Sequence, residues 1–269
     1  MKKRALTQFA YLRRLSLGKI ADPAAVASLI RRLFPVTTPL ELIRIGGEGD
    51  GGYLIPDDLD GVVACFSPGV DVIALFEAAL VARGIPCYLA DASVDAAPID
   101  DPLVHFEKKF LGVVDDPMTV TLDAWVARCV PAAGDLILQM DIEGGEWPVL
   151  LNVSDAVLRR FRIIVLELHG MERIVDRFGF SIIDAALDRL LRNYHVVHNH
   201  PNNQMDAVKL GDLVIPPLLE VTLLRKDRAA PTGFATSFPH ALDRKNVEER
   251  PDLALPINWH AVAGRLPSD

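Results

Sequence analysis

The sequence predicts an α/β fold in which a mostly parallel sheet is covered by helices on both faces. From Gly61 onward, short apolar runs typical of strands alternate with runs whose apolar residues are spaced three and four apart, as in helices. Hydrophobic residues make up 50% of the chain and the mean hydropathy is +0.23, which is enough apolar material for a large buried core. The run Ile-Ile-Val-Leu at 163–166 is apolar on both sides and indicates a central strand.

The composition limits the partners and the compartment that we expect. The 269 residues include 28 Lys and Arg against 36 Asp and Glu, so the formal net charge is −8 and we expect no nucleic-acid partner. Cys65, Cys87 and Cys129 form no C-x-x-C pair and cannot close a set of disulfides, which favours a reducing, cytoplasmic location. No segment approaches the roughly 18 consecutive apolar residues of a transmembrane segment.

We divide the chain into a helical extension over 1–43, a sheet-bearing domain over 44–230 and a wrapping segment over 231–269. The basic start lacks the apolar region of a signal peptide. It is either an amphipathic helix that touches a membrane or, in the interpretation we favour, a solvated helix that packs on the body or on a second copy in a homo-oligomer. Its apolar side consists of Leu6, Phe9, Leu12 and Leu15. The Pro-rich end wraps the body or covers the cleft, with Trp259 as a packing anchor.

The expected elements follow one another in a regular order. Asp22-Pro23 begins a helix whose apolar stripe ends at Leu33. The expected strands cover 62–66, 86–90, 104–111, 135–140, 162–168, 195–198 and 218–224. Further helices cover 74–83, 121–129, a segment from 146, a segment after 154 and a long segment that ends near 191. Because ligands bind beyond the carboxyl ends of such strands, polar residues that directly follow a strand are the candidates for function.

Residues 47–52 form a glycine-rich loop that matches the dinucleotide fingerprint G-x-G-x-x-G. That fingerprint binds a pyrophosphate where it follows a strand and opens a helix. Here an extended run and Pro56 follow instead, so we expect no helix. Two other interpretations stay open: a glycine-rich loop that leads into the sheet, or a loop that lines a cofactor cleft and contributes Asp50 and Tyr53.

The first two strand ends indicate an adenosine cofactor without phosphate. Ser67 and Gly69 lie in a small-residue turn that leaves backbone N–H groups free to face a ligand, and the helix after it carries Glu77. Asp91 follows the second strand, where an acidic residue accepts hydrogen bonds from a ribose diol. The first turn lacks the glycines that a pyrophosphate requires, which favours S-adenosylmethionine. In the alternative interpretation, Asp91 only caps a turn with Ser93.

The next two strand ends combine acidic side chains with an imidazole. Asp141 and Glu143 follow the strand at 135–140, and Glu167 and His169 end the strand at 162–168. Neighbouring parallel strands place these ends side by side, so we expect the four side chains to converge above the sheet. Paired carboxylates there serve a cation, a proton or a hydrogen-bond network. Asp141, Glu167 and His169 would suit Mg²⁺ or Mn²⁺.

Two further polar residues have both a functional and a simpler interpretation. Glu146 can be a first-turn acid that the helix dipole favours. His198 belongs to a polar cluster at 198–203 that follows a later strand. We consider His198 as a further catalytic residue, although a histidine in this position can also lie in a turn without a role.

Several segments resemble the FkbM-type S-adenosylmethionine-dependent methyltransferases. DIEGGEW at 141–147 is similar to the D-[IV]-E-G-x-E segment of that family, and the resemblance extends over about 44–259. Its weaker parts are the segments 50–59, 65–71, 76–77, 89–93, 121–125, 165–170 and 216–227. The resemblance implies the Rossmann-like, seven-stranded sheet of class I methyltransferases, in which the last strand is antiparallel. The run 66–69 departs from the glycine-rich first motif of the family, which begins with an acidic residue.

The resemblance also implies an S-adenosyl-L-methionine-dependent O-methyltransferase that acts on a hydroxyl group of a sugar, a glycan or a secondary metabolite. We expect His169 to be the base, because the pKa of imidazole lies near working pH, with Asp141 as its electrostatic partner or a metal ligand and His198 as a third catalytic candidate. The expected cofactor-binding residues are Asp50, Tyr53, Ser67, Gly69, Glu77, Asp91, Ala92, Ser93 and Asp141. The alternatives are an NAD(P)-dependent oxidoreductase and a non-catalytic binding protein on the same fold.

Overall fold

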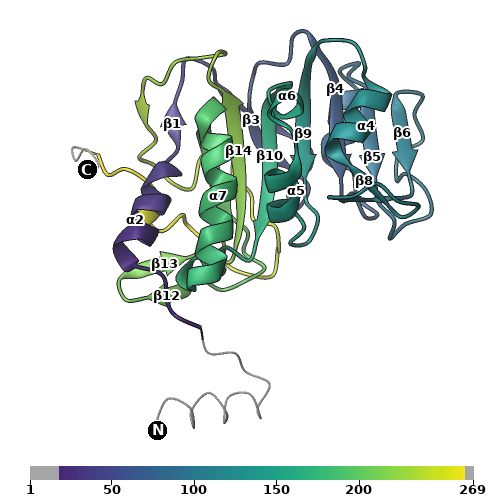
Figure 1. Ribbon diagram of the computed structural model, residues 1–269. Coiled ribbons are helices and arrows are strands. Elements are labelled where there is room, and N and C mark those ends of the chain that lie inside the picture. The colour runs from purple at the N-terminus through teal and green to yellow at the C-terminus, as the bar shows by residue number, and fades with distance from the viewer. Residues whose placement is uncertain (1–17, 264–269) are drawn as a thin grey trace, which may run out of the picture.

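The sheet expected from the sequence is present in the computed structural model, which describes residues 18–263 (Figure 1). Seven strands run in the order β11-β14-β10-β9-β4-β5-β6. They are β4 Val62–Pro68, β5 Cys87–Ala90, β6 Val104–Glu107, β9 Asp135–Met140, β10 Phe161–His169, β11 Tyr194–Pro201 and β14 Leu218–Arg225. Only β14 in this sheet is antiparallel to its neighbours, and the other neighbouring strands pair in parallel. The predicted α/β class and the antiparallel last strand are confirmed.

The middle of the sheet consists of strands that are buried on both faces. Residues 161–168 of β10 and 136–140 of β9 are all buried. Because successive side chains of a strand point to opposite faces, this burial requires a packed layer on each side of the sheet. The two sides have separate hydrophobic cores, one with Phe66 and Leu138 and the other with Ile137 and Val165.

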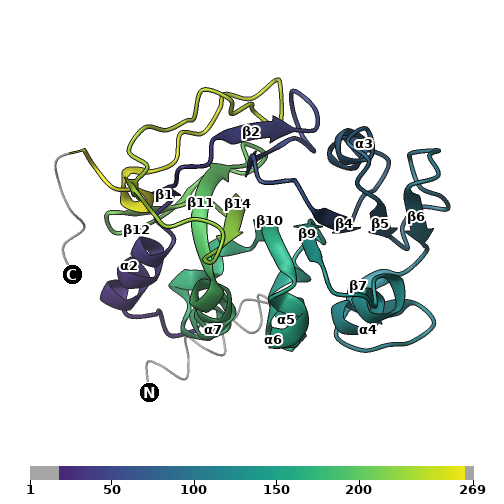
Figure 2. The ribbon, with the colours of Figure 1, turned by 90° about the horizontal axis from the view of Figure 1, so that it is seen from above.

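Most helices cover one face of the sheet, where they form a single layer (Figure 2). They are α2 Pro23–Arg32, α4 Leu122–Cys129, α5 Glu146–Asn152, α6 Asp155–Leu158 and α7 Arg177–Asn193, with the 3-10 helix η1 Met171–Val175 before α7. The side chains of Asp22, Thr121, Ser154 and Asp176 cap α2, α4, α6 and α7. No helix among the described residues is both long and apolar enough to cross a bilayer. The amphipathic helix expected at the start of the chain, with Leu6, Phe9, Leu12 and Leu15 on its apolar side, lies outside the described residues.

The other face is covered by the helix α3 Leu75–Val81 and by an antiparallel hairpin of β2 Leu42–Ile45 and β3 Tyr53–Pro56 (Figure 2). The glycine-rich loop 46–52 is the turn of this hairpin and leads into β3, so no helix follows the G-x-G-x-x-G match. The hydroxyl of Thr222 on β14 donates to the Leu54 carbonyl oxygen at 2.7 Å. β3 also contacts β10 and β11, so the hairpin lies over β10, β11 and β14.

The C-terminal segment 235–263 passes the hairpin loop, where Asn246 contacts Asp50, and ends beside α2 in the core under the helical layer (Figure 2). The side chain of Trp259 is fully buried and its Nε1–H donates to the Val214 carbonyl oxygen at 2.7 Å. Asn203 Nδ2 donates to the Val247 carbonyl oxygen at 2.9 Å. The remaining elements are β1 Val36–Thr37 paired with β15 Gly233–Phe234, β12 Val208–Leu210 paired with β13 Leu213–Ile215, and the 3-10 helix η2 Ile257–Trp259.

The structure corrects one expected strand. Residues 104–111 form β6 in the main sheet and a separate strand, β7 Phe110–Gly112, which pairs with β8 Thr119–Thr121. The break lies at Lys108 and Lys109, where the Lys109 N–H donates back to the Glu107 carbonyl oxygen at 2.8 Å. Two consecutive lysines interrupt the apolar run and end the strand, and Phe110 turns away from the sheet.

The loops after β4 and β9 approach each other so closely that one position requires glycine. Gly69 has a φ of +82°, and a Cβ atom on it would lie 1.6 Å from the Asp141 carbonyl oxygen. Backbone hydrogen bonds join the same loops, because the Asp141 N–H donates to the Pro68 carbonyl at 3.3 Å and the Gly69 N–H to the Ala90 carbonyl at 3.0 Å. The ends of β4, β5 and β9 are thereby held together.

We predict that Gly69→Ala destabilises the protein by more than about 3 kcal/mol, because the new methyl group forces these loops apart. Gly84→Ala is the matched control, since Gly84 has a φ of +77° but no atom within 4 Å of a built Cβ. We expect Gly84→Ala to cost only about 1–2 kcal/mol, the strain of the left-handed backbone. Urea unfolding of both variants measures the difference, and equal losses would contradict the close approach.

Candidate active site

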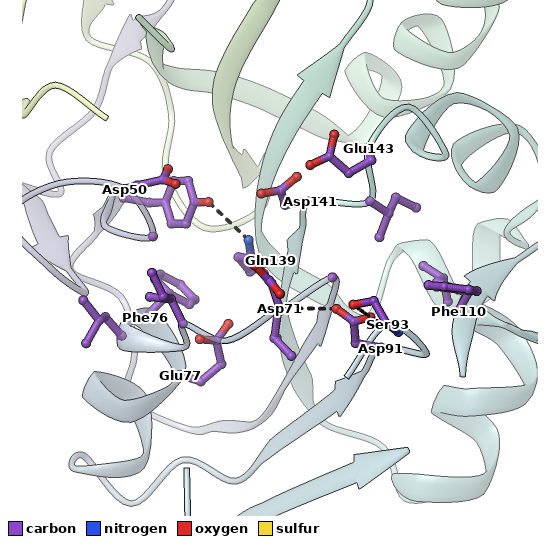
Figure 3. Close-up of a pocket in the computed structure, with 18 residues that line it drawn as sticks. Asp50, Asp71, Phe76, Glu77, Asp91, Ser93, Phe110, Gln139, Asp141 and Glu143 are labelled. Atoms are coloured by element: carbon purple, nitrogen blue, oxygen red, sulfur yellow. Dashed lines mark hydrogen bonds between the residues drawn. The ribbon is translucent and has the colours of Figure 1, made fainter. Parts of the chain in front are cut away.

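A cleft of about 440 Å³ lies at the carboxyl ends of β4, β5 and β9, where sheets of this type bind ligands (Figure 3). Asp91 and Ser93 lie on one side of it together with Phe110, and Asp50 of the hairpin loop lies on the other. The lining residues are Asp50, Gly51, Tyr53, Gly69, Val70, Asp71, Ile73, Leu75, Phe76, Glu77, Asp91, Ser93, Phe110, Leu111, Gln139, Asp141, Ile142 and Glu143. The cleft therefore combines an apolar rim with carboxylates from three strand ends.

Asp91 organises the loop after β4. Its Oδ2 accepts from the Asp71 N–H at 2.9 Å, and its Oδ1 accepts from the Ser93 N–H at 2.7 Å and from the Ser93 hydroxyl at 2.6 Å. Burial by itself would raise the pKa of Asp91, but these hydrogen bonds outweigh it and the pKa is lowered. A carboxylate has about four acceptor positions, so Asp91 caps this turn and keeps capacity for a ligand hydroxyl. Asp71 is held at a φ of +42°, a strained backbone conformation of the kind that often marks functional loops.

A buried polar chain underlies the cleft. The Ser67 hydroxyl lies within hydrogen-bond distance of both Glu77 Oε1 and Gln139 Oε1, the second at 2.6 Å. One hydroxyl proton cannot serve both oxygens. Burial raises the pKa of Glu77 and so favours its protonated form, which can donate to Ser67 while Ser67 donates to Gln139. Gln139 Nε2 in turn donates to the Tyr53 hydroxyl at 3.4 Å, so the chain links α3, β4, β9 and the hairpin.

Glu146 at the start of α5 is a site residue that the sequence suggested only as a helix-terminus acid. Its side chain is fully buried, and Oε1 accepts from the N–H groups of Ile142 at 3.0 Å and Gly144 at 3.3 Å. The same oxygen accepts from His169 Nδ1 at 3.1 Å, and the neighbouring Trp147 Nε1–H donates to the His169 carbonyl oxygen at 2.8 Å. A glutamate at the start of a helix can accept hydrogen bonds from N–H groups of the loop before it. The position of Glu146 directly after Gly144 and Gly145 was therefore the feature of the sequence that could have predicted this role.

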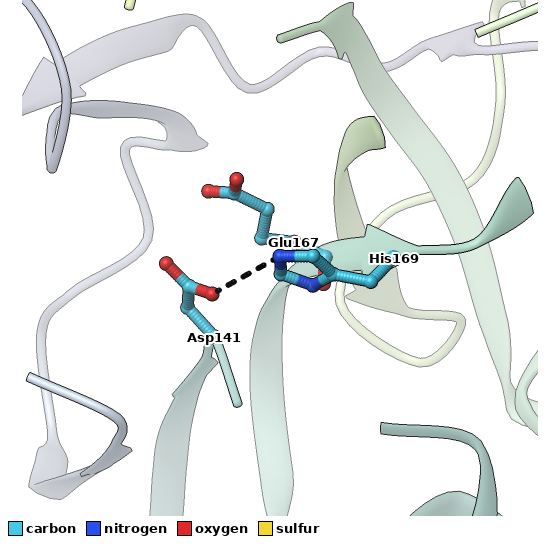
Figure 4. A group of neighbouring side chains, drawn as sticks. All are labelled: Asp141, Glu167 and His169. Carbon is cyan, nitrogen blue, oxygen red and sulfur yellow. Dashed lines mark hydrogen bonds and ion pairs between the residues drawn. The ribbon is translucent and has the colours of Figure 1, made fainter. Parts of the chain in front are cut away.

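The surroundings of His169 fix its tautomer. Nδ1 lies 3.1 Å from Glu146 Oε1 and 3.2 Å from the Glu167 carbonyl oxygen, and both of these are acceptors, so Nδ1 carries a proton. Nε2 is then the basic nitrogen of the neutral ring. It lies 3.9 Å from Asp141 Oδ1 (Figure 4). Glu143 Oε2 lies 3.4 Å from the same nitrogen. Nε2 therefore points toward the carboxylates that border the cleft.

Charge around His169 shifts its pKa and that of Asp141. Burial alone would lower the pKa of His169, but the hydrogen bond and charge of Glu146 and the charges of Asp141 and Glu143 outweigh it, so the pKa is raised. Burial raises the pKa of Asp141 to about 7, with His169 opposing the shift and Glu143 and Glu146 adding to it. Near neutral pH this pair therefore exchanges protons easily, as acid–base catalysis requires.

Asp141, Glu167 and His169, the metal-ligating set expected from the sequence, lie together (Figure 4). One ligand atom from each lies within 4.8 Å of the others. Asn202 Nδ2 donates to Glu167 Oε1 at 3.0 Å, whereas the buried Glu167 Oε2 has no hydrogen-bond partner in the part of the chain that the structure describes. Burial and the charges of Asp141, Glu220 and Asp50 raise the pKa of Glu167 well above its ordinary value. This trio can hold a proton or a divalent cation.

The structure corrects the position of His198. β11 continues to Pro201, so His198 lies inside the strand, in register with Thr222 of β14, and not beyond its end. Its Nε2–H donates to Asp243 Oδ1 on the C-terminal segment at 2.8 Å, and the residue is 4% exposed. Neither His198 nor His169 lines the cleft itself, but His169 faces Asp141 at its border, whereas the His198 ring is bound to Asp243, so the geometry gives the expected catalytic role of His198 no support.

The expected cofactor-binding residues fall into two groups. Ala92 and Ser67 do not line the cleft, and Ser67 instead belongs to the buried chain beneath it. The others line it: Asp50, Tyr53, Gly69, Glu77, Asp91, Ser93 and Asp141. Of these, Glu77 is directed to Ser67 and is only 3% exposed. Gly69 and Asp91 shape the loop after β4: Gly69 by its backbone conformation, and Asp91 by its hydrogen bond to the Asp71 N–H.

The model of the methyltransferase FkbM domain matches residues 82–194. These residues extend from the end of α3 to the start of β11 and include Asp91, the DIEGGEW segment and His169. Residues 82–194 are therefore similar to the methyltransferase FkbM domain, and this segment carries the part of the site at the ends of β5, β9 and β10. The resemblance expected from the sequence is confirmed. No curated protein matches the chain at a significant level.

Solved structures with a similar arrangement include WbdD, at 15% identity and a TM-score of 0.33 over 63% of this chain and 38% of that one. TrmN from Thermus thermophilus matches at 10% identity and a TM-score of 0.31, over 61% of this chain and 44% of that one. PH1948 from Pyrococcus horikoshii matches at 10% identity and a TM-score of 0.32, over 62% of this chain and 75% of that one. The chain thus spans less than half the length of WbdD and of TrmN.

We predict that Glu146→Gln lowers the pKa of His169, because the amide keeps the hydrogen-bonding oxygen but removes the charge that stabilises the imidazolium. The amide oxygen can still accept from Ile142 and Gly144, so the loop should stay folded. NMR titration of the histidine ring signals measures the shift. Glu143→Gln is the control: that side chain is 88% exposed, and we expect a smaller change. An unchanged His169 pKa in Glu146→Gln would contradict the role assigned to Glu146.

Proposed function

We propose that this methyltransferase uses S-adenosylmethionine to methylate a hydroxyl group of a sugar or glycan. The observation that carries the proposal is the position of His169, whose basic Nε2 faces Asp141 at the border of the cleft. An alcohol is a poor nucleophile while protonated, and a positioned base speeds its reaction by roughly 10²–10⁴-fold. An imidazole fixed in one tautomer by a buried carboxylate is suited to that task.

The cleft fits the donor by its chemistry. Asp91 and Ser93 offer acceptors to the hydroxyl groups of a ribose, and Phe110, Leu111 and Ile142 offer apolar surface to an adenine ring. Among the described residues, the cleft is lined by carboxylates and by no lysine or arginine, which favours a cofactor without a pyrophosphate. When bound, S-adenosylmethionine supplies an activated methyl group. Asp50 and Asp141 complement the positive charge of its sulfonium and ammonium groups.

His169 and its neighbours would then handle the proton of the acceptor. Nε2 accepts the hydroxyl proton, and Glu146 stabilises the imidazolium that forms through its hydrogen bond to Nδ1. Asp141, with a pKa of about 7, is close enough to take up the proton afterwards. The acceptor oxygen is left with increased negative charge, and the rate otherwise depends on how well the chain orients it.

A divalent cation at Asp141, Glu167 and His169 is a second form of the same proposal. Carboxylate oxygens with one imidazole suit Mg²⁺ or Mn²⁺, and the unpartnered Glu167 Oε2 would gain a ligand. Such an ion would lower the pKa of a bound hydroxyl. With the ion in place, His169 would serve as its ligand, and Asp141 would no longer need a proton.

The preference for a sugar or glycan rests on the polar groups beyond the cleft. Glu167, Asn202 and Glu220 lie at the ends of β10, β11 and β14, next to Asp50. Carboxylate and amide groups at such density suit an acceptor with several hydroxyl groups. A secondary metabolite with a comparable set of hydroxyls would meet the same requirement.

We predict that His169→Gln lowers kcat for methyl transfer by roughly 10²–10⁴-fold and leaves the affinity for S-adenosylhomocysteine within about twofold. Transfer of a labelled methyl group to a panel of sugars and glycans measures the first quantity, and calorimetry measures the second. In the wild type, kcat/KM should rise with pH through the raised pKa of His169, because only the unprotonated ring accepts a proton.

The matched control is His195→Gln. His195 lies near the start of β11, far along the strand from the acidic residues, and pairs with Leu224 of β14. We expect this variant to be fully active. Near wild-type turnover in His169→Gln would remove His169 from the mechanism. Tight binding of NAD(P) in place of S-adenosyl compounds would favour an oxidoreductase, and cofactor binding without transfer to any hydroxyl would favour a binding protein.

A further inference from the structure

A row of acidic side chains continues from the active site across the sheet. Glu167 on β10 lies directly opposite Glu220 on β14, and Glu220 lies directly opposite His200 on β11. Like charges in directly opposed positions of a sheet repel each other. His200 Nδ1–H donates to Glu220 Oε2 at 3.1 Å, so one charge of the row is compensated. Glu167 has no such cationic partner among the described residues.

Asp50 of the hairpin loop adds a carboxylate to this row. Oxygens of Asp50, Glu167 and Glu220 all lie within 4.8 Å of one another, a second trio that shares Glu167 with the first. The two glutamates are buried and only Asp50 is exposed. The sequence had suggested Asp50 as a cofactor contact and had not singled out Glu220.

One buried oxygen atom of this trio, Glu167 Oε2, has no hydrogen-bond partner among the described residues. Glu167 is 4% exposed. Leaving a buried carboxylate oxygen unpaired is costly, because the oxygen has lost water and gained nothing in exchange. Because Glu167 belongs to both trios, this oxygen can bind an ion at either one.

The C-terminal segment contributes an amide side chain, Asn246, that contacts two of these carboxylates. Asn246 Nδ2 donates to Glu220 Oε1 at 2.5 Å and to Asp50 Oδ1 at 3.2 Å. Asn246 Oδ1 is buried and has no partner in the described part of the chain. The amide N–H group thus bridges two carboxylates as a weak substitute for a cation. Rotation of this amide by half a turn would offer Oδ1 as a further oxygen ligand.

We propose that Asp50, Glu167 and Glu220 form a second divalent-cation site, selective for Mg²⁺ or Mn²⁺, with Glu167 bridging it to the first trio. Oxygen donors without sulfur favour these hard ions. Paired metal sites that share a carboxylate hold their ions about 3.5–4 Å apart. Two ions at that spacing bind two neighbouring oxygens, such as vicinal hydroxyls of a sugar. The inference rests on the proposed function only for this last role, since ion binding needs no methyl donor.

The test is a titration of the full chain with Mn²⁺, in which electron paramagnetic resonance measures the free ion in the absence of any S-adenosyl compound. We expect the wild type to bind one equivalent at this trio, and a further one at the first trio in the ion-bound form of the proposed function. Asp50→Asn should weaken the equivalent at this trio at least about tenfold. Because Asp50 is exposed, this variant should fold, and thermal unfolding without metal checks that it does.

Glu48→Gln is the matched control from the same loop. Glu48 is 81% exposed on its side chain, pairs with Arg244 and belongs to neither trio, so this variant should bind Mn²⁺ as the wild type does. Glu220→Gln should reproduce the loss seen in Asp50→Asn. A wild type that binds no Mn²⁺, or an Asp50→Asn variant that binds like Glu48→Gln, would overturn the second site. Failure of methyl transfer would leave these outcomes unaffected and would count against the proposed function alone.

Discussion

Repulsion between carboxylates at the ends of β9, β10 and β14 is the constraint on which the site depends. Asp141, Glu167 and Glu220 come from adjacent strands, and Asp50 reaches them from the hairpin loop. Taking such groups out of water costs free energy unless a proton, a cation or hydrogen-bond donors compensate. The raised pKa values of Asp141 and Glu167 are the response of the protein to that cost without an ion. Compensation by a proton leaves groups beside the cleft that exchange protons, and compensation by a cation leaves groups there that bind an ion.

Two contacts position these carboxylates and His169. The close contact of Gly69 with the Asp141 carbonyl holds the ends of β4 and β9 together, so the cleft and the acidic row share one border. Glu146 then ties the loop after β9 to His169 through a single buried oxygen. A helix-start glutamate thus fixes both the course of the loop and the tautomer of the imidazole. The DIEGGEW segment supplies acid, turn and support within seven consecutive residues.

The sequence was sufficient for the sheet and for the convergence of Asp141, Glu167 and His169, because strand ends in a parallel sheet lie at one edge. It could not place His198, since the length of β11 depends on pairing with β14 and on the segment that covers it. Glu220 was missed for the same reason: an antiparallel strand carries its acid to the edge at its beginning, where a search of strand ends does not look. Contacts such as Asn246 with Asp50 join residues 196 positions apart, and no local pattern predicts them.

The central claim is that an adenosine-bearing sulfonium lies across the cleft between Asp91 and Asp141. A crystal structure of the full chain with S-adenosylhomocysteine tests it most directly. We expect the ribose hydroxyls beside Asp91 and Ser93, and the thioether sulfur on the side of Asp141 and His169. A ligand bound elsewhere, or a cleft that stays empty at saturating concentration, would contradict the account.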